Sequence, residues 1–101
     1  MVSDRALWVR WRDMRDAEAF RALAEAYGGM VYGTALRVLG SPQDAEDVAQ
    51  ECFETLAAAQ KAPSAYLGPW LHRVAVNRAL NRRRGDMRRR AREAAYHAER
   101  G

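Results

Sequence analysis

Several residue types are scarce in this sequence, and each shortage excludes a class of protein. Cysteine occurs once, as Cys52, so neither a disulfide framework nor a thiolate metal cluster is possible within the chain. No apolar run approaches the roughly 18 residues of a membrane span, and the N-terminus has no apolar segment of signal-peptide length. We therefore expect a cytoplasmic protein that makes no contact with a membrane.

Groups that could carry catalysis are equally rare. The two histidines, His72 and His97, stand 25 residues apart, with no cysteine pair and no H-x-x-E-H spacing near them. Gly28-Gly29 is an isolated pair rather than a phosphate-binding loop. The sequence therefore predicts no enzyme, no metal site and no cofactor.

Strand signals are missing as well, and the fold class follows from what replaces them. Alternating β-branched residues are absent, while alanine, leucine, arginine and glutamate dominate. We expect an all-α protein, a compact bundle of about four helices with a basic C-terminal helical extension. At 101 residues it should be a single domain, 1–101, with a core over about 16–84 and a basic extension or linker over about 85–101.

The first two helices are marked by polar caps. Ser3 or Asp4 begins a short helix that ends near Met14, and Asp16 begins a second. Glycine destabilises helices, so a kink or brief break is expected at Gly28-Gly29. The second helix has an inward apolar stripe at intervals of three and four residues, formed by Phe20, Leu23, Ala24, Tyr27, Val31, Ala35 and Leu39.

A third helix begins clearly after Gly40. Ser41 is its expected N-cap, Pro42 its first residue, and Asp44 the partner of Ser41 in a capping box. The helix should end near Ala59 and bury Ala45, Val48, Cys52, Phe53 and Leu56.

A loop over 60–68 separates this helix from a fourth. The fourth helix should begin at Pro69 or Trp70 and run at least through Asn81. Its apolar residues are Leu71, Val74, Ala75 and Leu80, and from Arg82 onward we expect exposed helix or a frayed tail.

Charge is strongly polarised along the chain. Residues 1–68 carry seven Lys/Arg and ten Asp/Glu, a net charge of −3, whereas residues 69–101 carry ten basic and three acidic residues, a net charge of +7. Residues 69–92 contain nine arginines and a single acidic residue, Asp86. The C-terminal third is thus suited to a polyanion, because each bound phosphate releases counterions. The acidic middle third is suited to a basic partner.

Two clusters have a pattern more specific than charge. In the acidic stretch 44–51, the acids stabilise a helix N-terminus, yet the neutral amide of Gln50 favours a specific hydrogen-bonded contact. In the fourth helix, Trp70, Asn77 and Asn81 share one face beside arginines, which suits contacts to bases or sugars. Trp70 is equally consistent with a core anchor, and Tyr66 with either base stacking or a cover over the core.

Two strings in the right order indicate a family. D-A-E-D-V-x-Q-E-x-F begins at residue 44, and W-L-x-R-V-A-x-N-x-A-x-N begins at residue 70. Together, over about residues 16–92, the chain resembles region 2 of bacterial sigma-70 family sigma factors, particularly the extracytoplasmic-function (ECF) group. The resemblance implies a helical domain that docks on RNA polymerase and recognises and helps melt the −10 promoter element.

The resemblance also implies roles for individual residues. The acidic helix of such factors binds the clamp helices of the polymerase β′ subunit, which corresponds here to Asp44, Glu46, Asp47, Gln50 and Glu51. The following loop, about 61–67, forms a pocket for a flipped base of the non-template strand, with Lys61, Ser64 and Tyr66 as contacts. The last helix meets the upstream edge of the melting duplex through Trp70, Arg73, Asn77, Arg78 and Asn81. The arginine run then contacts phosphates, beginning with Arg82, Arg83 and Arg84.

Two alternative functions stay open from the sequence. One is a basic helical module that binds DNA or RNA nonspecifically through residues 82–92. The other is a protein-interaction domain sequestered by an anti-sigma factor. Sigma factors also carry a second helical domain, region 4, and the sequence contains no segment that resembles it, so we expect a fragment or a truncated factor.

Overall fold

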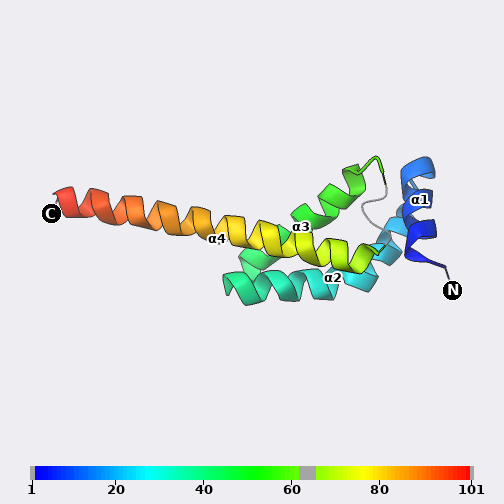
Figure 1. Cartoon of the computed structure of the whole chain (residues 1–101), viewed down its shortest axis with the longest axis horizontal. Helices are drawn as coiled ribbons and strands as arrows, with labels where there is room; N and C mark the ends of the chain where they lie inside the picture. Colours follow the sequence, from blue (N-terminus) through cyan, green and yellow to red (C-terminus); the bar gives the residue numbers. More distant parts are fainter. Residues whose placement is uncertain (1, 62–65, 101) are drawn as a thin grey trace.

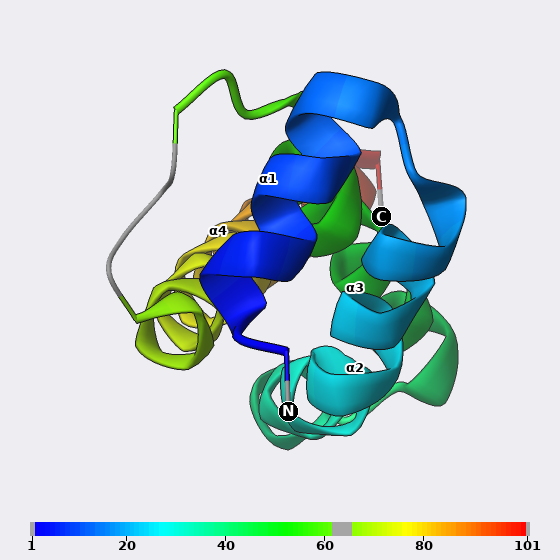
Figure 2. The ribbon, with the colours of Figure 1, turned by 90° about the vertical axis from the view of Figure 1, so that its right-hand side faces the viewer.

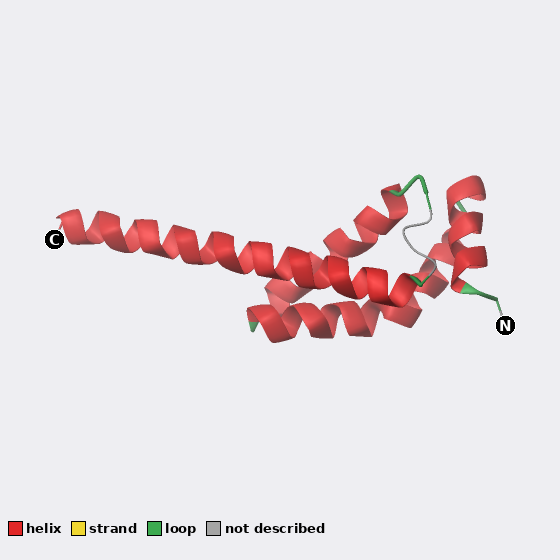
Figure 3. Ribbon diagram, viewed as in Figure 1, coloured by secondary structure: helices red, strands yellow, loops and turns green. Residues whose placement is uncertain are grey.

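Four helices account for nearly all of the described chain. The computed structural model describes residues 2–61 and 66–100, and this part contains helices and no strands (Figures 1 and 3). The helices are α1 (Asp4–Met14), α2 (Ala17–Leu39), α3 (Pro42–Ala58) and α4 (Leu67–Arg100). The expected all-α class with about four helices is confirmed.

The helices begin where the capping residues predict. The Ser3 hydroxyl accepts a hydrogen bond from the backbone N–H of Ala6, and the Asp16 carboxylate accepts bonds from two backbone N–H groups at the start of α2. Ser41 accepts a bond from the backbone N–H of Asp44 at 3.3 Å. Each bond satisfies a donor that the helix itself leaves without a partner, and the three predicted starts are confirmed.

The capping box of α3 is only half formed within the described residues. Ser41 makes its part of the motif, but the carboxylate of Asp44 binds Arg82 of α4. An ion pair to another helix has thus replaced the local bond that the sequence pattern predicts.

Of the two outcomes expected at Gly28-Gly29, the break is wrong, whereas a kink agrees with the change of direction between the two halves of α2 in Figures 1 and 2. The helix runs without interruption from Ala17 to Leu39, through Gly28 and Gly29, and neither glycine has a positive φ. Glycine lowers helix stability by roughly 0.5–1 kcal/mol relative to alanine, which is small beside the burial of a long helix. Because α2 packs against α1, α3 and α4, tertiary contacts outweigh this local cost.

The fourth helix is longer at both ends than its pattern indicates. It begins at Leu67, two residues before the expected Pro69. Pro69 still lies in the first turn, where backbone N–H groups have no partner within the helix, so the N–H that proline lacks costs no hydrogen bond. It continues to Arg100, so the segment after Arg82 is exposed helix rather than a frayed tail.

The core lies where α2, α3 and α4 meet. Of the predicted inward positions, nine are buried: Leu23, Val31, Ala35, Ala45, Val48, Cys52, Leu56, Leu71 and Ala75. Others are only partly buried, namely Ala24, Tyr27, Leu39, Val74 and Leu80, and further buried positions are Ala19, Thr34 and Ala79. The core side chains that are fully inaccessible to solvent include Leu23, Val31, Val48, Cys52, Leu56, Leu71 and Ala75. The predicted Phe20 and Phe53 are only partly buried and meet edge to face, with ring centroids 6.5 Å apart.

Helix α1 lies across the end of the bundle, as Figure 2 shows. Trp8 is buried in the core, and the indole N–H of Trp11 donates a 3.0 Å hydrogen bond to the carbonyl of Ala57. Arg15 donates to the same carbonyl at 3.3 Å. This carbonyl belongs to the last turn of α3, where the helix cannot supply a donor, so α1 completes the end of α3.

Beyond the bundle, α4 projects alone. All residues from Met87 to Arg100 are exposed, and the molecule measures 62 × 23 × 21 Å (Figure 1). Its Cα radius of gyration is 17.1 Å, whereas a compact chain of this length would have about 13 Å. No helix in the described ranges has the length and apolar character needed to cross a membrane.

Candidate functional site

The predicted acidic residues share one surface of α3. Because Ala45, Val48 and Cys52 turn toward the core, the intervening acids face outward. Glu46, Asp47 and Gln50 are exposed, while Asp44 and Glu51 are half-buried against α4. We call this surface, formed by Asp44, Glu46, Asp47, Gln50, Glu51 and the neighbouring Glu54, the α3 acidic face.

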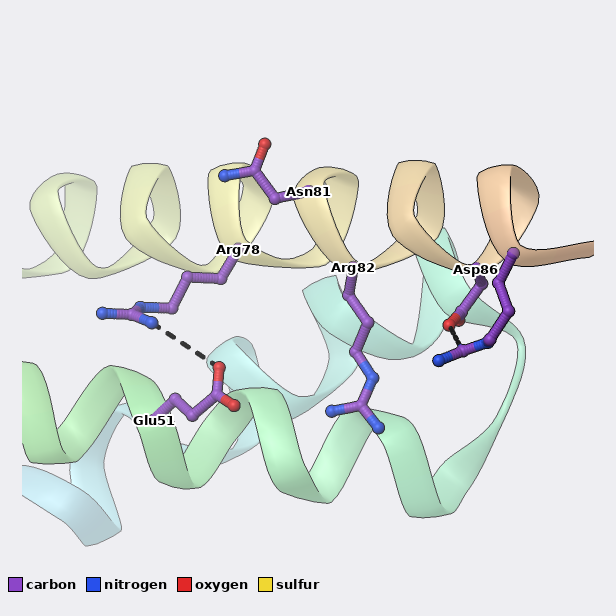
Figure 4. A pocket seen from close by; sticks show the side chains of 6 residues that line it. Glu51, Arg78, Asn81, Arg82 and Asp86 are labelled. Atoms are coloured by element: carbon purple, nitrogen blue, oxygen red, sulfur yellow. Dashed lines mark hydrogen bonds and ion pairs between the residues drawn. The ribbon is translucent and has the colours of Figure 1, made fainter. Parts of the chain in front are cut away.

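Two arginines that were predicted to contact DNA point toward this face. One guanidinium nitrogen of Arg82 lies 2.9 Å from a carboxylate oxygen of Asp44 and 3.3 Å from one of Asp47. Arg78 lies 3.6 Å from a carboxylate oxygen of Glu51 (Figure 4). These contacts tie α4 to α3 at two successive turns.

A hydrogen bond to Thr55 adds to the contact between Arg78 and Glu51. Arg78 donates to the hydroxyl of Thr55 at 2.7 Å, and that hydroxyl donates in turn to the carbonyl of Glu51 at 2.9 Å. The Arg78 and Arg82 side chains remain 41% and 33% exposed, so water weakens their ion pairs. Exposed pairs of this kind contribute about 0.2–1 kcal/mol each. They therefore help to orient α4 relative to α3 but add little to the stability of the fold.

The groove between α3 and α4 consequently alternates in charge. It is lined by Glu51, Arg78, Asn81, Arg82, Asp86 and Arg89 (Figure 4). Arg89 pairs with Asp86 on the same helix, so positive and negative groups follow one another along the groove. Such a surface is not a uniformly positive channel for nucleic acid.

The outer face of α4, turned away from α3, has a different character. Arg73 and Asn77 are exposed there, and Asn81 is exposed at the border between this face and the groove. Arg84 donates a 3.2 Å hydrogen bond to the side-chain oxygen of Asn81. Trp70 is half-buried and packs against the core, which favours its role as an anchor while leaving part of its ring accessible. The structure thus brings the predicted amides and Arg73 onto one accessible surface, apart from Arg78 and Arg82.

Two further arginines continue this outer face. Arg88 and Arg92 follow Arg84 at intervals of four residues on the same uninterrupted helix, and all three are exposed. The sequence pattern treats 82–92 as one basic run, whereas the folded helix distributes it over several faces. The four-residue spacing of Arg84, Arg88 and Arg92 can be seen in the sequence. It places them on one face only if the helix continues past Gly85, as it does in the structure.

The loop before α4 is described in part. Lys61 is exposed, and the ring of Tyr66 is 75% exposed, so Tyr66 does not cover the core. Ser64 lies outside the described residues.

The start of α4 is held closely against α2. A Cβ atom at Gly68 would lie 3.2 Å from a ring carbon of Tyr27, so only glycine fits there without displacement. The Tyr27 hydroxyl donates a hydrogen bond to the carboxylate of Asp4, and this bond raises the pKa of Tyr27. This contact with Tyr27 positions the first turn of α4, and with it Trp70, relative to the bundle.

The described residues contain no cluster of histidine, cysteine, aspartate or glutamate side chains that could hold a metal ion. Neither the curated proteins nor the solved structures provide a significant match to the chain. The family model of sigma-70 region 2, in contrast, matches residues 23–91, which is more than half of the chain and includes α3 and the bundle part of α4. The chain therefore belongs to the sigma-70 region 2 family, the sigma factor domain that acts with RNA polymerase and promoter DNA in transcription initiation.

Proposed function

We propose that this domain is region 2 of an ECF-type sigma factor. In this proposal the α3 acidic face binds the clamp helices of the β′ subunit, and the outer face of α4 with the preceding loop recognises the −10 element. The observation that carries the proposal is the separation of the two surfaces. Glu46 and Gln50 are exposed on α3, while Asn77 and Asn81 are exposed on α4, so a protein and a nucleic acid can be bound at once.

Promoter melting in this proposal is a binding effect. Extruding a base from a duplex costs a few kcal/mol, and contacts made only to the open strand shift the equilibrium toward melting. Tyr66 immediately precedes α4, and both Tyr66 and Lys61 are exposed. The domain itself carries out no chemical step, which belongs to the polymerase.

The proposed clamp contact is best tested by mutating residues of α3 that do not also hold α3 against α4. Asp44, Asp47 and Glu51 already pair with arginines of α4, so their replacement also disturbs the fold. Glu46 and Gln50 make no ion pair or side-chain hydrogen bond within the described residues. They are the suitable positions for substitution.

Glu46→Lys and Gln50→Ala should each weaken binding to a β′ clamp-helix fragment. We expect a loss of about tenfold for the charge reversal, which corresponds to about 1.4 kcal/mol, and a smaller loss for the amide. Affinity is measured by titration calorimetry with the whole chain. Glu25→Lys, an exposed acid on α2, is the matched control and should bind as the original protein does. Unchanged affinity for both α3 variants would rule out this face as the clamp contact.

Nonspecific binding of nucleic acid is the competing function, favoured by the exposed arginines of α4. The two functions differ in whether binding depends on the DNA sequence. The proposed function requires non-template single-stranded −10 DNA to bind better than random DNA of equal length. Equal binding of both, with a steep salt dependence, would favour the nonspecific function. An anti-sigma partner stays a prediction without an assigned surface.

A further inference from the structure

The connection between α3 and α4 is held at its α3 end by helix α1. The carbonyl of Ala57, in the last turn of α3, accepts hydrogen bonds from the indole N–H of Trp11 at 3.0 Å and from Arg15 at 3.3 Å. The Trp11 ring packs in turn against Phe20 of α2, with the two ring centroids 4.9 Å apart. The direction in which the chain leaves α3 therefore depends on α1.

The α4 end of the same connection is held through α2. The ring of Tyr27 lies so close to Gly68 that a Cβ atom there would be 3.2 Å from a ring carbon. The Tyr27 hydroxyl donates a hydrogen bond to the carboxylate of Asp4, in the first turn of α1. Figure 1 shows both ends of the connection at the end of the bundle that α1 covers. Helix α1 thus influences both ends, directly at Ala57 and through Tyr27 at Gly68.

These two ends lack the local signals that define the other helix ends. Helices α1 and α2 stop at residues in the left-handed conformation, Arg15 and Gly40, as helices commonly do. Helix α3 stops instead at Ala59, with extended backbone and no basic residue in its last turn. The first three helices begin after serine or aspartate caps, whereas Tyr66, the residue before α4, is not a capping type. Tertiary contacts therefore have to set where both ends lie.

The side chains next to these ends are proposed contacts to the −10 element. Lys61 and Tyr66 belong to the connection, and Trp70 lies in the first turn of α4, where its backbone N–H donates to the carbonyl of Tyr66 at 3.4 Å. Each of the three is within four residues of Ala57 or Gly68 along the chain. A displacement of either end therefore moves the side chains that would meet the DNA.

We propose that Asp4, Trp11 and Tyr27 are positioning residues for recognition of the −10 element. They touch no DNA themselves. They hold the two ends of the connection in the arrangement in which its side chains and those of the first turn of α4 accept an unpaired base. The inference rests on the proposed function, and it adds that selectivity for the DNA sequence depends on α1. Because apparent affinity falls with the fraction of molecules in the competent arrangement, loosening either end lowers selective binding.

Four variants of the whole chain separate positioning from other effects. Trp11→Phe removes the N–H donor and keeps a ring against Phe20, while Tyr27→Phe removes the hydroxyl and keeps a ring against Gly68. Asp4→Ala removes the acceptor for Tyr27, whereas Asp4→Asn keeps an oxygen acceptor with the same loss of charge. The last two proteins therefore carry equal charge and differ in one hydrogen bond.

Each protein is titrated with two DNA probes and one protein probe. The first DNA probe is the single strand that the original protein enriches from a randomised pool, and the second is the unselected pool. The ratio of the two affinities measures selectivity, and the β′ clamp-helix fragment is the protein probe. Ala35→Gly controls for destabilisation alone, because it weakens α2 at a buried position about two turns beyond Tyr27. Urea unfolding compares the stability of all variants.

Trp11→Phe, Tyr27→Phe and Asp4→Ala should each reduce selectivity about fivefold, the factor that corresponds to one ordinary hydrogen bond. Asp4→Asn should restore most of the selectivity that Asp4→Ala loses. Ala35→Gly should keep the selectivity of the original protein, although it unfolds at a lower urea concentration. Every variant should bind the clamp-helix fragment as the original protein does, because the α3 acidic face is not altered.

Unchanged selectivity in Trp11→Phe or in Tyr27→Phe would overturn the inference. Equal losses in Asp4→Asn and Asp4→Ala would do the same, since the hydrogen bond would then be irrelevant. A similar loss in Ala35→Gly, or a parallel loss of clamp-helix affinity, would mean that the variants act only through general stability, and would also overturn it. Failure of the proposed function is distinguishable, because the original protein would then enrich no sequence from the pool, which would overturn both.

Discussion

Asp16 performs two tasks at once between α1 and α2. One carboxylate oxygen caps α2 by accepting bonds from the backbone N–H groups of Glu18 and Ala19. The other lies 2.7 Å from a guanidinium nitrogen of Arg10. The bond to Arg10 is the main reason why the pKa of Asp16 lies below its ordinary value of 3.8, and the cap lowers it further. A single side chain thus joins α1 to the start of α2.

This lowered pKa predicts a pH dependence of stability. Since the folded protein holds the carboxylate form, the stabilisation by Asp16 is complete above pH 3.8 and is lost as the pH falls toward the lower folded pKa. Asp16→Asn keeps a good capping residue but removes the charge. Urea unfolding at pH 5 and pH 3 should therefore show a smaller acid-induced loss in the variant than in the original protein. Parallel losses would mean that Asp16 does not contribute to the acid sensitivity.

At the scale of a helix, α2 shows how packing overrides local preference. Gly28 and Gly29 lie inside a continuous helix, and a Cβ atom at either position would meet no atom within 4 Å. Neither position therefore needs glycine for space or for backbone conformation. Gly40 differs, because it ends α2 with a φ of 71°, a conformation that other residues adopt only with strain.

Gly29→Ala should therefore stabilise the domain. The expected gain is about 0.5–1 kcal/mol, because alanine restricts the unfolded chain and favours helix. In a domain of this size, this would raise Tm by about 2–8 °C, measured by circular dichroism. Gly40→Ala is the opposite control and should lower Tm. A lower Tm for Gly29→Ala would indicate that α2 needs flexibility at that position.

At the scale of the molecule, stability and the exposed extension are separate. The buried side chains come from α1, α2, α3 and the part of α4 up to Ala79, while residues 87–100 are exposed on all sides. The extension remains helical because the bundle supplies the nucleus on which the helix can propagate.

Deletion of residues 91–100 should leave the bundle intact. We expect the free energy of unfolding to change by less than about 0.5 kcal/mol, as for surface positions without packing contacts. Helical ellipticity should fall roughly in proportion to the removed helix, and the urea midpoint should stay constant. A loss of several kcal/mol would mean that the extension packs against the bundle in solution.

The sequence by itself determined the features that depend on neighbouring residues. Ser3, Asp16 and Ser41 mark helix starts because a cap satisfies backbone donors within three residues of itself. The three- and four-residue spacing of apolar side chains predicted the buried sides of the helices, since this spacing alone places them on one face. The two strings at residues 44 and 70 indicated the family, which the match over residues 23–91 establishes.

Only the tertiary structure decided how the charged residues are used. Arg78 and Arg82 belong to the same basic segment as Arg84 and Arg88, yet the first two face acids of α3 and the others face solvent. These ion pairs and hydrogen bonds join residues that are 23 to 38 positions apart in the sequence. They form only when α3 and α4 lie at the right distance and rotation relative to each other. Such geometry arises from packing the whole core, and no local pattern encodes it. For the same reason, the continuity of α2 through its glycines became evident only with its neighbours in place.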